Sequence, residues 1–572
     1  MTTARTLGIL LALIPSLYAP TALAKKPKKD AAAQKPSVDE WGQEETPVPA
    51  ASAPSSSTKS TSSEVAGDRA NNNKPPEAKP EEKPAKAVEA APASAPSAEV
   101  EPEPARAAPV RAPAAEPVEA PPVAATPVVS GGVQKSTGNA DSPEGVTWKA
   151  SGWDVTLYGY AALNVMQDST QSFGTGSGNT VIQRRGTIRG NRLQAQATSR
   201  DSRLGLRLAA PQIGAVRSSV NIETDFNAPP PIEYTEASSV TNAGLRMRHY
   251  YMKVETPVVD FIAGQYHDLF GWGGKGFYPS TLAFLGITGE IYHRQPQIRL
   301  SKIMNGGGAV EFEVAGAVLR PVQKNGGYPD VEAGLRLAFN NWTGARQQAY
   351  GQPGIGAAGI GVSAIGRHFE VAQFLEFPGD TVPGTGYGIA GNLFLPIIPA
   401  HNNKDRGNSL SIIAEYSRGT GIGDMYNGDL TGGLLFPSLP NPQDRQQPTN
   451  PPPVYTPNID SGIVTFDGDN RLRTCDWEGI VAGLQYYLPI MRGRWWVSGN
   501  FSQAKSANIN DLTPIQGRGG VYTRSRYYDG NLFIAITDQI QMGFSFQQID
   551  QLLGDGVQTQ NRRTEFGMHM FF

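Results

Sequence analysis

The sequence predicts an all-β protein: a 16-stranded antiparallel transmembrane β-barrel preceded by a disordered segment. Three observations predict it. The composition changes near residue 150, apolar and polar residues alternate repeatedly after that point, and an aromatic residue ends the chain. No run of about 18 apolar residues follows the first 24 residues, so helical membrane spans are not expected. Barrel strands carry only a weak apolar signal, because just one of their faces meets lipid.

The first 24 residues are expected to be a secretory signal peptide. Arg5 supplies an early positive charge, residues 7–14 form a short apolar run, and Ala22 and Ala24 have the spacing of a cleavage site. Exported proteins often contain disulfides, but Cys475 is the only cysteine. No intramolecular disulfide is therefore expected.

Residues 25–148 are expected to form a disordered periplasmic tether. Ala, Pro, Lys, Glu and Ser dominate this stretch, and its few large apolar residues cannot form a core. Its proline content favours an extended chain. One hypothesis is that the tether reaches the cell wall, with Trp41 as a short docking motif; the simpler alternative is a solvated spacer.

Residues 150–572 show the period-two alternation of strands that have one apolar and one polar face. Short connections, such as 211–214, alternate with long ones, such as 420–476, so the short turns and both ends of the barrel are expected on the periplasmic side. The connection from 340 to 356 is an exception, because it is longer than a periplasmic turn should be. The sixteen alternating segments begin near residues 153, 190, 215, 245, 259, 292, 309, 330, 358, 386, 409, 478, 495, 524, 541 and 561.

The last strand carries apolar residues at alternate positions up to the terminal Phe572. This ending resembles the closing strand of bacterial outer-membrane proteins, in which the terminal aromatic residue serves the assembly machinery. A barrel of sixteen strands is too wide for side chains to fill, so its lumen is expected to be an aqueous channel. The expected location is therefore the Gram-negative outer membrane.

Motifs on five consecutive strands, within about residues 150–305, resemble the DcaP-like porins, a family of trimeric outer-membrane channels. The resemblance implies passive diffusion of small hydrophilic solutes with a preference for anions such as dicarboxylates. It also implies a homotrimer embedded in outer-membrane lipid and lipopolysaccharide. Family members carry a predicted helical coiled coil before the barrel, where this chain has its Pro/Ala-rich segment. The motifs are Ser202–Arg207 (SRLGLR), Ile222–Phe226 (IETDF), Leu245–Tyr250 (LRMRHY), Ala263–Gln265 (AGQ) and Arg294–Arg299 (RQPQIR).

Inward-facing arginines are the candidate selectivity residues. Residues 151–572 contain 28 Arg against 6 Lys, and the planar guanidinium group matches a carboxylate with two hydrogen bonds. A positive wall in a narrow passage concentrates anions. Strand parity turns six arginines toward the lumen: Arg203, Arg207, Arg217, Arg246, Arg248 and Arg299.

Structural pairing is the alternative role for these arginines. Residues 151–572 hold 34 Lys+Arg and 34 Asp+Glu, so the arginines have enough carboxylates to form a paired ladder that stiffens the barrel without selecting anions. Arginines near the extracellular rim would instead meet the phosphates of lipopolysaccharide. The luminal acids expected to pair are Glu223, Asp225, Glu311, Glu313 and Glu332.

The stretch of about 268–291 is expected, from the resemblance, to fold inward as a constriction loop. Its charged residues are Asp268, Lys275 and Glu290, and its aromatic residues include Trp272. The hypothesis is that the acids face the arginines across the passage while the aromatic side chains wedge the loop against the barrel. The alternative is a surface Ω-loop packed by its own side chains.

An enzyme is not expected, because the six histidines are scattered and no nucleophile, phosphate-loop or metal-binding motif is present. Neither a cofactor nor a nucleic-acid partner is expected. The long loop of about 422–473 is rich in proline, and its Asp467-Gly-Asp-Asn470 cluster is better explained as a turn than as a calcium site. A structural or receptor-type barrel with a plugged pore is the alternative function.

Overall fold

The computed structural model describes residues 145–176, 180–228, 244–282, 287–323, 326–348, 351–373, 380–427, 430, 462–467, 469 and 471–572. The predicted signal peptide and nearly all of the predicted tether lie outside these residues, as do residues 283–286 of the predicted constriction loop and 431–461 of the proline-rich loop. No helix in the described part of the chain is long and apolar enough to cross a membrane.

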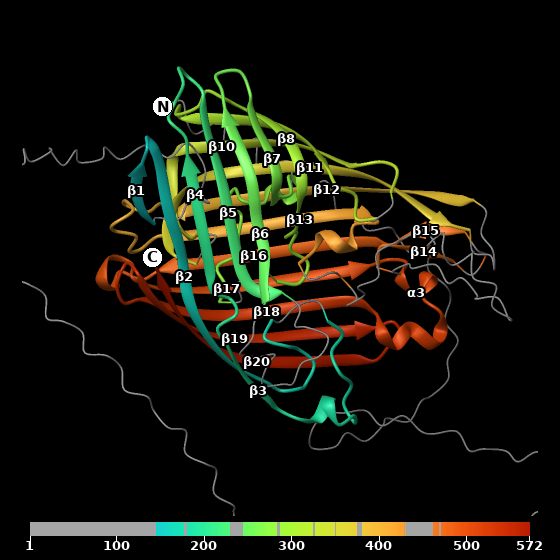
Figure 1. Cartoon of the computed structure of the whole chain (residues 1–572). Coiled ribbons are helices and arrows are strands. Elements are labelled where there is room, and N and C mark those ends of the chain that lie inside the picture. The colour runs from blue at the N-terminus through green and yellow to red at the C-terminus, as the bar shows by residue number, and fades with distance from the viewer. Residues whose placement is uncertain are drawn as a thin grey trace, which may run out of the picture. The chain divides into compact units, whose positions relative to one another are not determined.

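One antiparallel sheet closes on itself, because the last strand pairs with β2 over residues Tyr160 to Asp168 (Figure 1). The sheet has eighteen hydrogen-bonded strands, but they fill sixteen positions around the barrel. Strands β3 and β4 pair with successive parts of β2 and share one position. Strand β1 pairs only with β2, beyond the point where β20 ends. The prediction of a 16-stranded barrel is therefore confirmed.

The strands of the barrel follow the predicted order. Their bounds are β1 Val146–Ala150, β2 Trp153–Asp168, β3 Gln194–Thr198, β4 Arg203–Ala209, β5 Arg217–Ala228, β6 Gly244–Glu255, β7 Asp260–His267, β8 Arg294–Met304, β9 Val310–Leu319, β10 Asp330–Gln347, β11 Pro353–Ala372, β12 Thr381–Ile398, β13 Leu410–Thr420, β16 Asp476–Tyr487, β17 Trp495–Ser506, β18 Tyr522–Ala535, β19 Ile540–Leu553 and β20 Gln558–Phe571.

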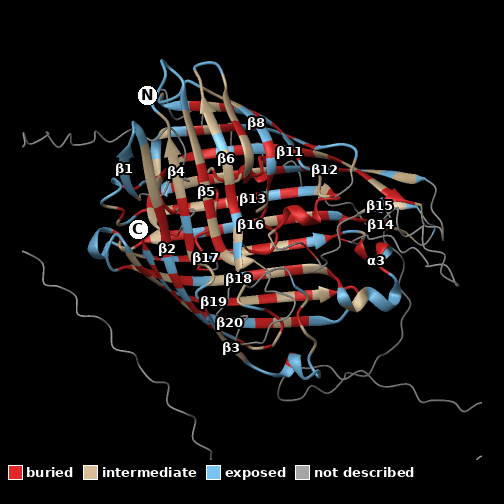
Figure 2. Cartoon of the chain, viewed as in Figure 1, coloured by how far each residue is buried: buried red, intermediate tan, exposed pale blue. Residues whose placement is uncertain are grey.

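Buried and exposed residues alternate along these strands, as Figure 2 shows for β10, β11 and β16 to β20. On β20, Met568 and Met570 are exposed on the outside, whereas His569 and Phe571 are buried on the inside. The exterior is thus apolar while the interior carries polar and charged side chains, which is the inverse of a soluble β-protein. This arrangement is that of a transmembrane barrel of the outer-membrane type.

Short turns lie at one end of the barrel and long loops at the other. Turns such as 256–259 and 536–539 lie at the end where β20 finishes, and loops such as 169–193, 268–293 and 421–475 lie at the other. The end with short turns and the chain terminus is the periplasmic side in barrels of this type. The longest loop contains a two-stranded sheet formed by β14 (Val464–Phe466) and β15 (Leu472–Thr474), which the sequence did not predict.

The predicted connection from 340 to 356 is wrong. Strand β10 continues through it to Gln347 and pairs with β11 on both sides of a bulge between Phe339 and Thr343. Beyond the bulge the hairpin turns into the lumen, where the Ala345 N–H donates to Ser409 Oγ at 3.0 Å and the Gln347 N–H donates to Gln485 Oε1 at 3.2 Å. The segment is long because it is a hairpin that folds inward, not a turn.

The described loops contain only short helical turns. They are the 3-10 turns η3 (Arg189–Asn191), η4 (Phe270–Trp272), η5 (Gly423–Met425), η7 (Ile490–Arg492) and η8 (Ile515–Gly520), and the α-helical turn α3 (Ile509–Leu512). Apolar residues of η5 and α3 pack with Phe270 and Ile291 in one buried cluster at the long-loop end. The loops at this end therefore pack on one another within the barrel.

Candidate functional site

The loop between β7 and β8 begins on the inner face of β10 and β11. The backbone N–H groups of Leu269 and Phe270 donate to one oxygen of Glu332 at 2.7 and 3.1 Å. The N–H of Gly271 donates to Ser363 Oγ at 2.8 Å. Glu332 and Ser363 are buried side chains of these two strands. The loop consequently crosses the lumen instead of extending into solvent.

Trp272 anchors the start of the loop by packing against two glycines of β10 and β11. Its indole N–H donates to the Val362 carbonyl at 3.0 Å, and only 1% of the residue is exposed. A Cβ atom at Gly361 would lie 2.6 Å from Trp272 Cδ1, and one at Gly334 would lie 2.8 Å from Cζ2. The indole therefore occupies space that any other residue at these two positions would fill.

The far part of the loop lies against the opposite side of the barrel. The Ser280 carbonyl accepts hydrogen bonds from Ser498 Oγ at 2.6 Å and from Asn500 Nδ2 at 2.7 Å, both on β17. The N–H of Ile291 donates to Glu415 Oε1 on β13 at 2.7 Å. Arg346, on the inward hairpin, donates to the Gly276 carbonyl at 2.6 Å. Residues on four separate strands thus hold the loop inside the barrel.

The four loop residues selected from the sequence are all largely buried, and none of the acids pairs with an arginine in the described residues. Asp268 Oδ2 lies 2.7 Å from His293 Nδ1. Glu290 accepts a hydrogen bond from the Ile287 N–H at 3.1 Å, and burial raises the pKa of its carboxyl group to about 7. Lys275 forms an ion pair of 2.9 Å with Glu313, and Trp272 packs against the barrel as described above.

Three of the six predicted arginines pair with carboxylates. Arg246 binds both oxygens of Asp225, at 2.9 and 2.6 Å. Arg248 donates to Glu223 at 2.7 Å and to Asp225 at 3.1 Å, and it is 2% exposed. Arg217 lies 3.6 Å from Glu255 in a more exposed pair. For these three arginines the pairing expected from the alternative role is present.

The other arginines of this region lie beside tyrosine rings. Arg203, Arg207 and Arg299 lie 5.4, 5.8 and 5.3 Å from the ring centroids of Tyr160, Tyr158 and Tyr266, respectively. Arg299 also donates to Gln297 Oε1 at 2.9 Å and to the His267 carbonyl. Within the described residues, Arg207 and Arg299 form no ion pair with a carboxylate.

The alternation of inward and outward positions along the sequence did not identify Arg294 and His249 as inward-facing residues. Arg294 donates to the Tyr292 hydroxyl at 3.2 Å and lies 5.1 Å from the centroid of that ring, and it has no carboxylate partner among the described residues. Arg248 donates to the same hydroxyl at 3.1 Å. A register shift between β5 and β6 lets Arg248 and His249 both face inward, because a bulge breaks the alternation.

Seven arginines lie on four neighbouring strands, β4, β5, β6 and β8, and we call them the basic wall: Arg203, Arg207, Arg217, Arg246, Arg248, Arg294 and Arg299. Tyrosine and histidine rings connect its members. His249 lies 4.8 Å from His267 and His267 lies 5.3 Å from Tyr292, between ring centroids. Among the described residues, Arg217, Arg246 and Arg248 form ion pairs with Glu223, Asp225 and Glu255, whereas Arg207, Arg294 and Arg299 form none.

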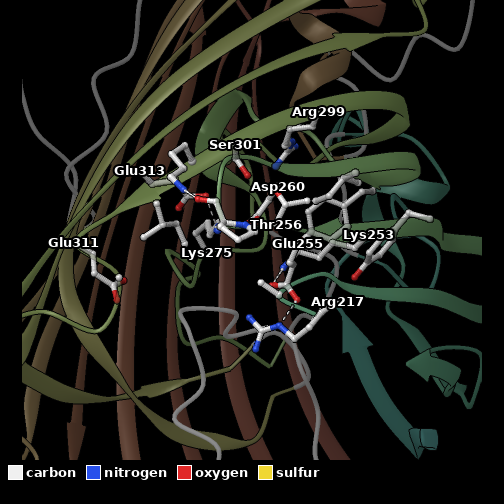
Figure 3. A pocket seen from close by; sticks show the side chains of 18 of the residues that line it. Arg217, Lys253, Glu255, Thr256, Asp260, Lys275, Arg299, Ser301, Glu311 and Glu313 are labelled. Atoms are coloured by element: carbon white, nitrogen blue, oxygen red, sulfur yellow. Dashed lines mark hydrogen bonds and ion pairs between the residues drawn. The ribbon is translucent and has the colours of Figure 1, made fainter. Parts of the chain in front are cut away.

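A cavity of about 350 Å³ opens beside the periplasmic turns of β5 to β9, with Lys275 of the loop among its lining residues (Figure 3). Figure 3 shows Arg217, Glu255 and Lys253 grouped on one side and Lys275 with Glu313 on another. Its charged lining residues are Arg217, Lys253, Lys275, Arg299 and Lys302 with Glu255, Asp260, Glu311 and Glu313. A polar, charged lining of this kind suits a hydrated solute.

The described residues contain no cluster of three or more side chains able to hold a metal ion. What the site offers instead is a set of fixed positive charges beside a loop that is anchored across the lumen.

Solved structures of other proteins share the barrel fold of this chain. No family model and no curated protein matches the chain. The outer membrane channel DcaP of Acinetobacter baumannii superposes with a TM-score of 0.51 at 16% identity, over 75% of this chain and 100% of that one. OmpT of Vibrio cholerae (TM-score 0.40, 9% identity, 74% and 99% covered) and an anion-selective porin from Comamonas acidovorans (0.40, 8%, 73% and 100%) are more distant. The expected likeness to DcaP is confirmed at the level of the fold, which is that of an outer-membrane porin.

Proposed function

We propose that the chain is a passive-diffusion porin of the outer membrane that prefers small anions, with dicarboxylates as the first class to test. The observation that carries this proposal is the basic wall. Three of its arginines, Arg207, Arg294 and Arg299, have no carboxylate partner among the described residues, although charged residues of both signs are equally numerous after residue 150.

An arginine that is partly removed from water acts strongly on a nearby ion, and this is the physical reason for expecting a preference for anions. Water screens an exposed ion pair, but a guanidinium group in a narrow passage between protein surfaces retains much of its field. The paired arginines, Arg246 and Arg248, contribute little net charge. They instead hold β5 and β6 in register and give the wall its rigidity, while the unpaired arginines attract the anion.

The test is the reversal potential of the purified protein in a planar bilayer under a KCl gradient. We expect chloride to be preferred, and we expect the triple variant Arg207→Gln/Arg294→Gln/Arg299→Gln to lose most of this preference at similar conductance. Steps in groups of three would support a homotrimer. Addition of a dicarboxylate should reduce the chloride current in the native protein more than in the variant.

The control is Arg562→Gln, which removes one positive charge from an exposed position on β20. It should leave the reversal potential unchanged. Equal ion selectivity in the triple variant and the native protein would reject the role of the basic wall. Folded protein that never conducts would favour the alternative of a plugged barrel, for which the buried loop cluster around Phe270, Ile291 and Tyr426 is the structural candidate.

A further inference from the structure

The inward hairpin, residues 343–347 of β10 and 353–357 of β11, is fixed to the inner wall of the barrel at the periplasmic end. The Ala345 N–H donates to Ser409 Oγ at 3.0 Å, and the Ala345 carbonyl accepts a hydrogen bond from Ser411 Oγ at 2.9 Å. Both serines are completely buried. The hairpin is therefore held against the periplasmic end of β13.

The inward hairpin also contacts the loop between β7 and β8 inside the lumen. Arg346 of the hairpin donates to the Gly276 carbonyl of the loop at 2.6 Å, and its guanidinium group lies 5.4 Å from the centroid of the Phe394 ring on β12. A Cβ atom at Gly276 would overlap this guanidinium group, so the contact requires glycine there. The loop enters from the extracellular end and the hairpin from the periplasmic end. Arg346 thus joins two segments that enter the barrel from opposite ends.

Three aromatic rings lie behind the hairpin, at the periplasmic ends of β16, β17 and β18. Trp496 stacks between Tyr487 and Phe533, with ring centroids 5.3 and 4.9 Å apart and an angle of 11° between the ring planes of each pair. All three residues are 0% exposed. Ala345 of the hairpin and Leu282 of the loop belong to the same buried cluster. Rings that faced a water-filled lumen would be exposed, so the hairpin and the loop exclude water from this part of the barrel.

Apolar clusters fill the same half of the lumen further toward the extracellular end. Trp272 and Phe277 of the loop pack in one cluster with Phe394 on β12 and Ile413 on β13. Beyond them, the cluster that contains Phe270 includes buried residues of β16, β17 and β18. The half of the barrel beside β12 to β18 therefore has a buried apolar filling at the periplasmic end, in the middle and at the extracellular end.

The other half of the lumen has a polar lining. The cavity of about 350 Å³ lies there, beside the periplasmic turns of β5 to β9. Lys275 of the loop, Arg299 and Ser301 are among its lining residues, and Figure 3 shows them around it. The basic wall lies on β4, β5, β6 and β8 of this same half. A hydrated solute therefore meets polar partners on this side and apolar, occupied space on the other.

We propose that the inward hairpin closes the periplasmic outlet of the lumen beside β12 to β18, so that solutes leave the barrel through the cavity beside β5 to β9. Arg346 is a positioning residue in this arrangement, because it joins the hairpin to the loop. The inference deepens the proposed function and rests on it, because a route confined to one half of the lumen makes every solute pass the basic wall. A shorter hairpin would open a second, parallel route that lacks these charges, and the charges that line a pore set its ion selectivity.

The first experiment measures the single-channel conductance and the reversal potential of the full-length protein in a planar bilayer under a KCl gradient. In the test variant, Asn-Gly replaces residues 341–356, which would leave Asn340 opposite Ala357 across a two-residue turn. We expect at least a twofold rise in conductance and a smaller preference for chloride. The control has Asn-Gly in place of residues 402–405, in the turn between β12 and β13, and should behave as the native protein does.

The second experiment tests the route with the hairpin at its native length. Every variant carries Cys475→Ser, which removes the only native thiol. Ser301→Cys, in the cavity, should react quickly with methanethiosulfonate reagents of either charge added on the periplasmic side, and Ser411→Cys, behind the hairpin, at least tenfold more slowly. Adding Arg346→Gln should speed the reaction of Ser411→Cys several-fold, whereas Arg346→Lys, which keeps a hydrogen-bond donor, should speed it less.

Unchanged conductance of a folded protein with the shortened hairpin would overturn the proposal, and so would equal reaction rates at the two cysteines. If the shortened protein does not fold, the reaction rates decide. Higher conductance with an unchanged chloride preference would support closure by the hairpin and reject the anion role of the basic wall. Loss of chloride preference in the triple arginine variant, with no change in conductance on shortening, would reject closure by the hairpin alone.

Discussion

At the scale of single residues, two glycines position the loop between β7 and β8, because they have no side chain. Gly361 and Gly334 leave space on the inner face of β10 and β11, and Trp272 fills that space and donates its indole N–H to Val362. The glycines of β11 weaken the intrinsic strand preference of that segment. Their function here is to admit an aromatic anchor of the loop, as expected for glycines in strands where another group approaches closely.

We predict that Gly361→Val destabilises the barrel by about 1–3 kcal/mol, the usual cost of overpacking a filled site. The new side chain would meet the indole of Trp272, because its Cβ would lie only 2.6 Å from the ring. Urea unfolding in lipid vesicles, followed by tryptophan fluorescence, measures the change. Gly391→Ala is the control, since its Cβ would meet no atom closer than 4.0 Å. Equal stability of the two variants would show that Trp272 does not occupy this site.

At the scale of elements, the loop between β7 and β8 is positioned by carboxyl groups that accept hydrogen bonds from its backbone. Glu332 holds the first turn and Glu415 holds the last, while Glu290 closes a turn within the loop by accepting the Ile287 N–H. Burying carboxylates is costly unless they are protonated or well bonded. The position of the loop is therefore coupled to pH.

We predict that docking of the loop weakens as the pH rises from about 4.5 through about 7. Burial raises the pKa of Glu290 to about 7 in the docked loop, from an ordinary value of 4.5. The docked state therefore binds a proton that the undocked state releases, so its advantage is complete at low pH and decreases above it. Amide hydrogen exchange at Gly271, corrected for its intrinsic pH dependence, would measure docking, because that amide bonds to the non-titrating Ser363.

The variant Glu290→Gln should flatten this pH dependence, since its neutral side chain keeps an oxygen for the Ile287 N–H. Glu415 interacts with Glu290 electrostatically and contributes its own titration, so the informative quantity is the difference between variant and native protein. Glu311→Gln is the control, because Glu311 bonds to Gly307 at a periplasmic turn. An identical pH profile for native protein and Glu290→Gln would exclude Glu290 as the titrating group.

Alternation in the sequence predicts the strands of the barrel but not the partners of its loop. Period-two alternation predicted all sixteen barrel positions in order, because one face of each strand meets lipid and the other does not. It failed from 340 to 356, where Asn340–Trp342 form a bulge and Gly344–Gln347 are buried on both faces. Partners of the loop were not predictable, because its hydrogen bonds join residues as far apart as Ser280 and Ser498, and such contacts are fixed only by closure of the barrel.

At the scale of the whole molecule, closure depends on the contact between the first and last strands of the barrel. Arg563 on β20 binds both oxygens of Asp168 on β2, at 2.9 and 2.8 Å, and also donates to the carbonyls of Gly174 and Thr175. Both charged side chains are almost completely buried, with 3% and 0% exposed. The pair joins residues 395 positions apart, so it can form only when the sheet has closed.

We predict that Asp168→Ala destabilises the folded barrel by about 3–5 kcal/mol, because it leaves a buried guanidinium group without its counter-charge. The double variant Asp168→Ala/Arg563→Met should recover much of this loss, since neither charge then remains buried. Asp538→Ala is the matched control: it breaks the Arg494–Asp538 pair of 3.0 Å at a periplasmic turn, where the Asp538 side chain is 80% exposed, and should cost less than about 1 kcal/mol. Urea unfolding in lipid vesicles distinguishes these cases. If the double variant were as unstable as Asp168→Ala, the loss would come from packing at the seam, and the ion pair would not be what holds the barrel closed.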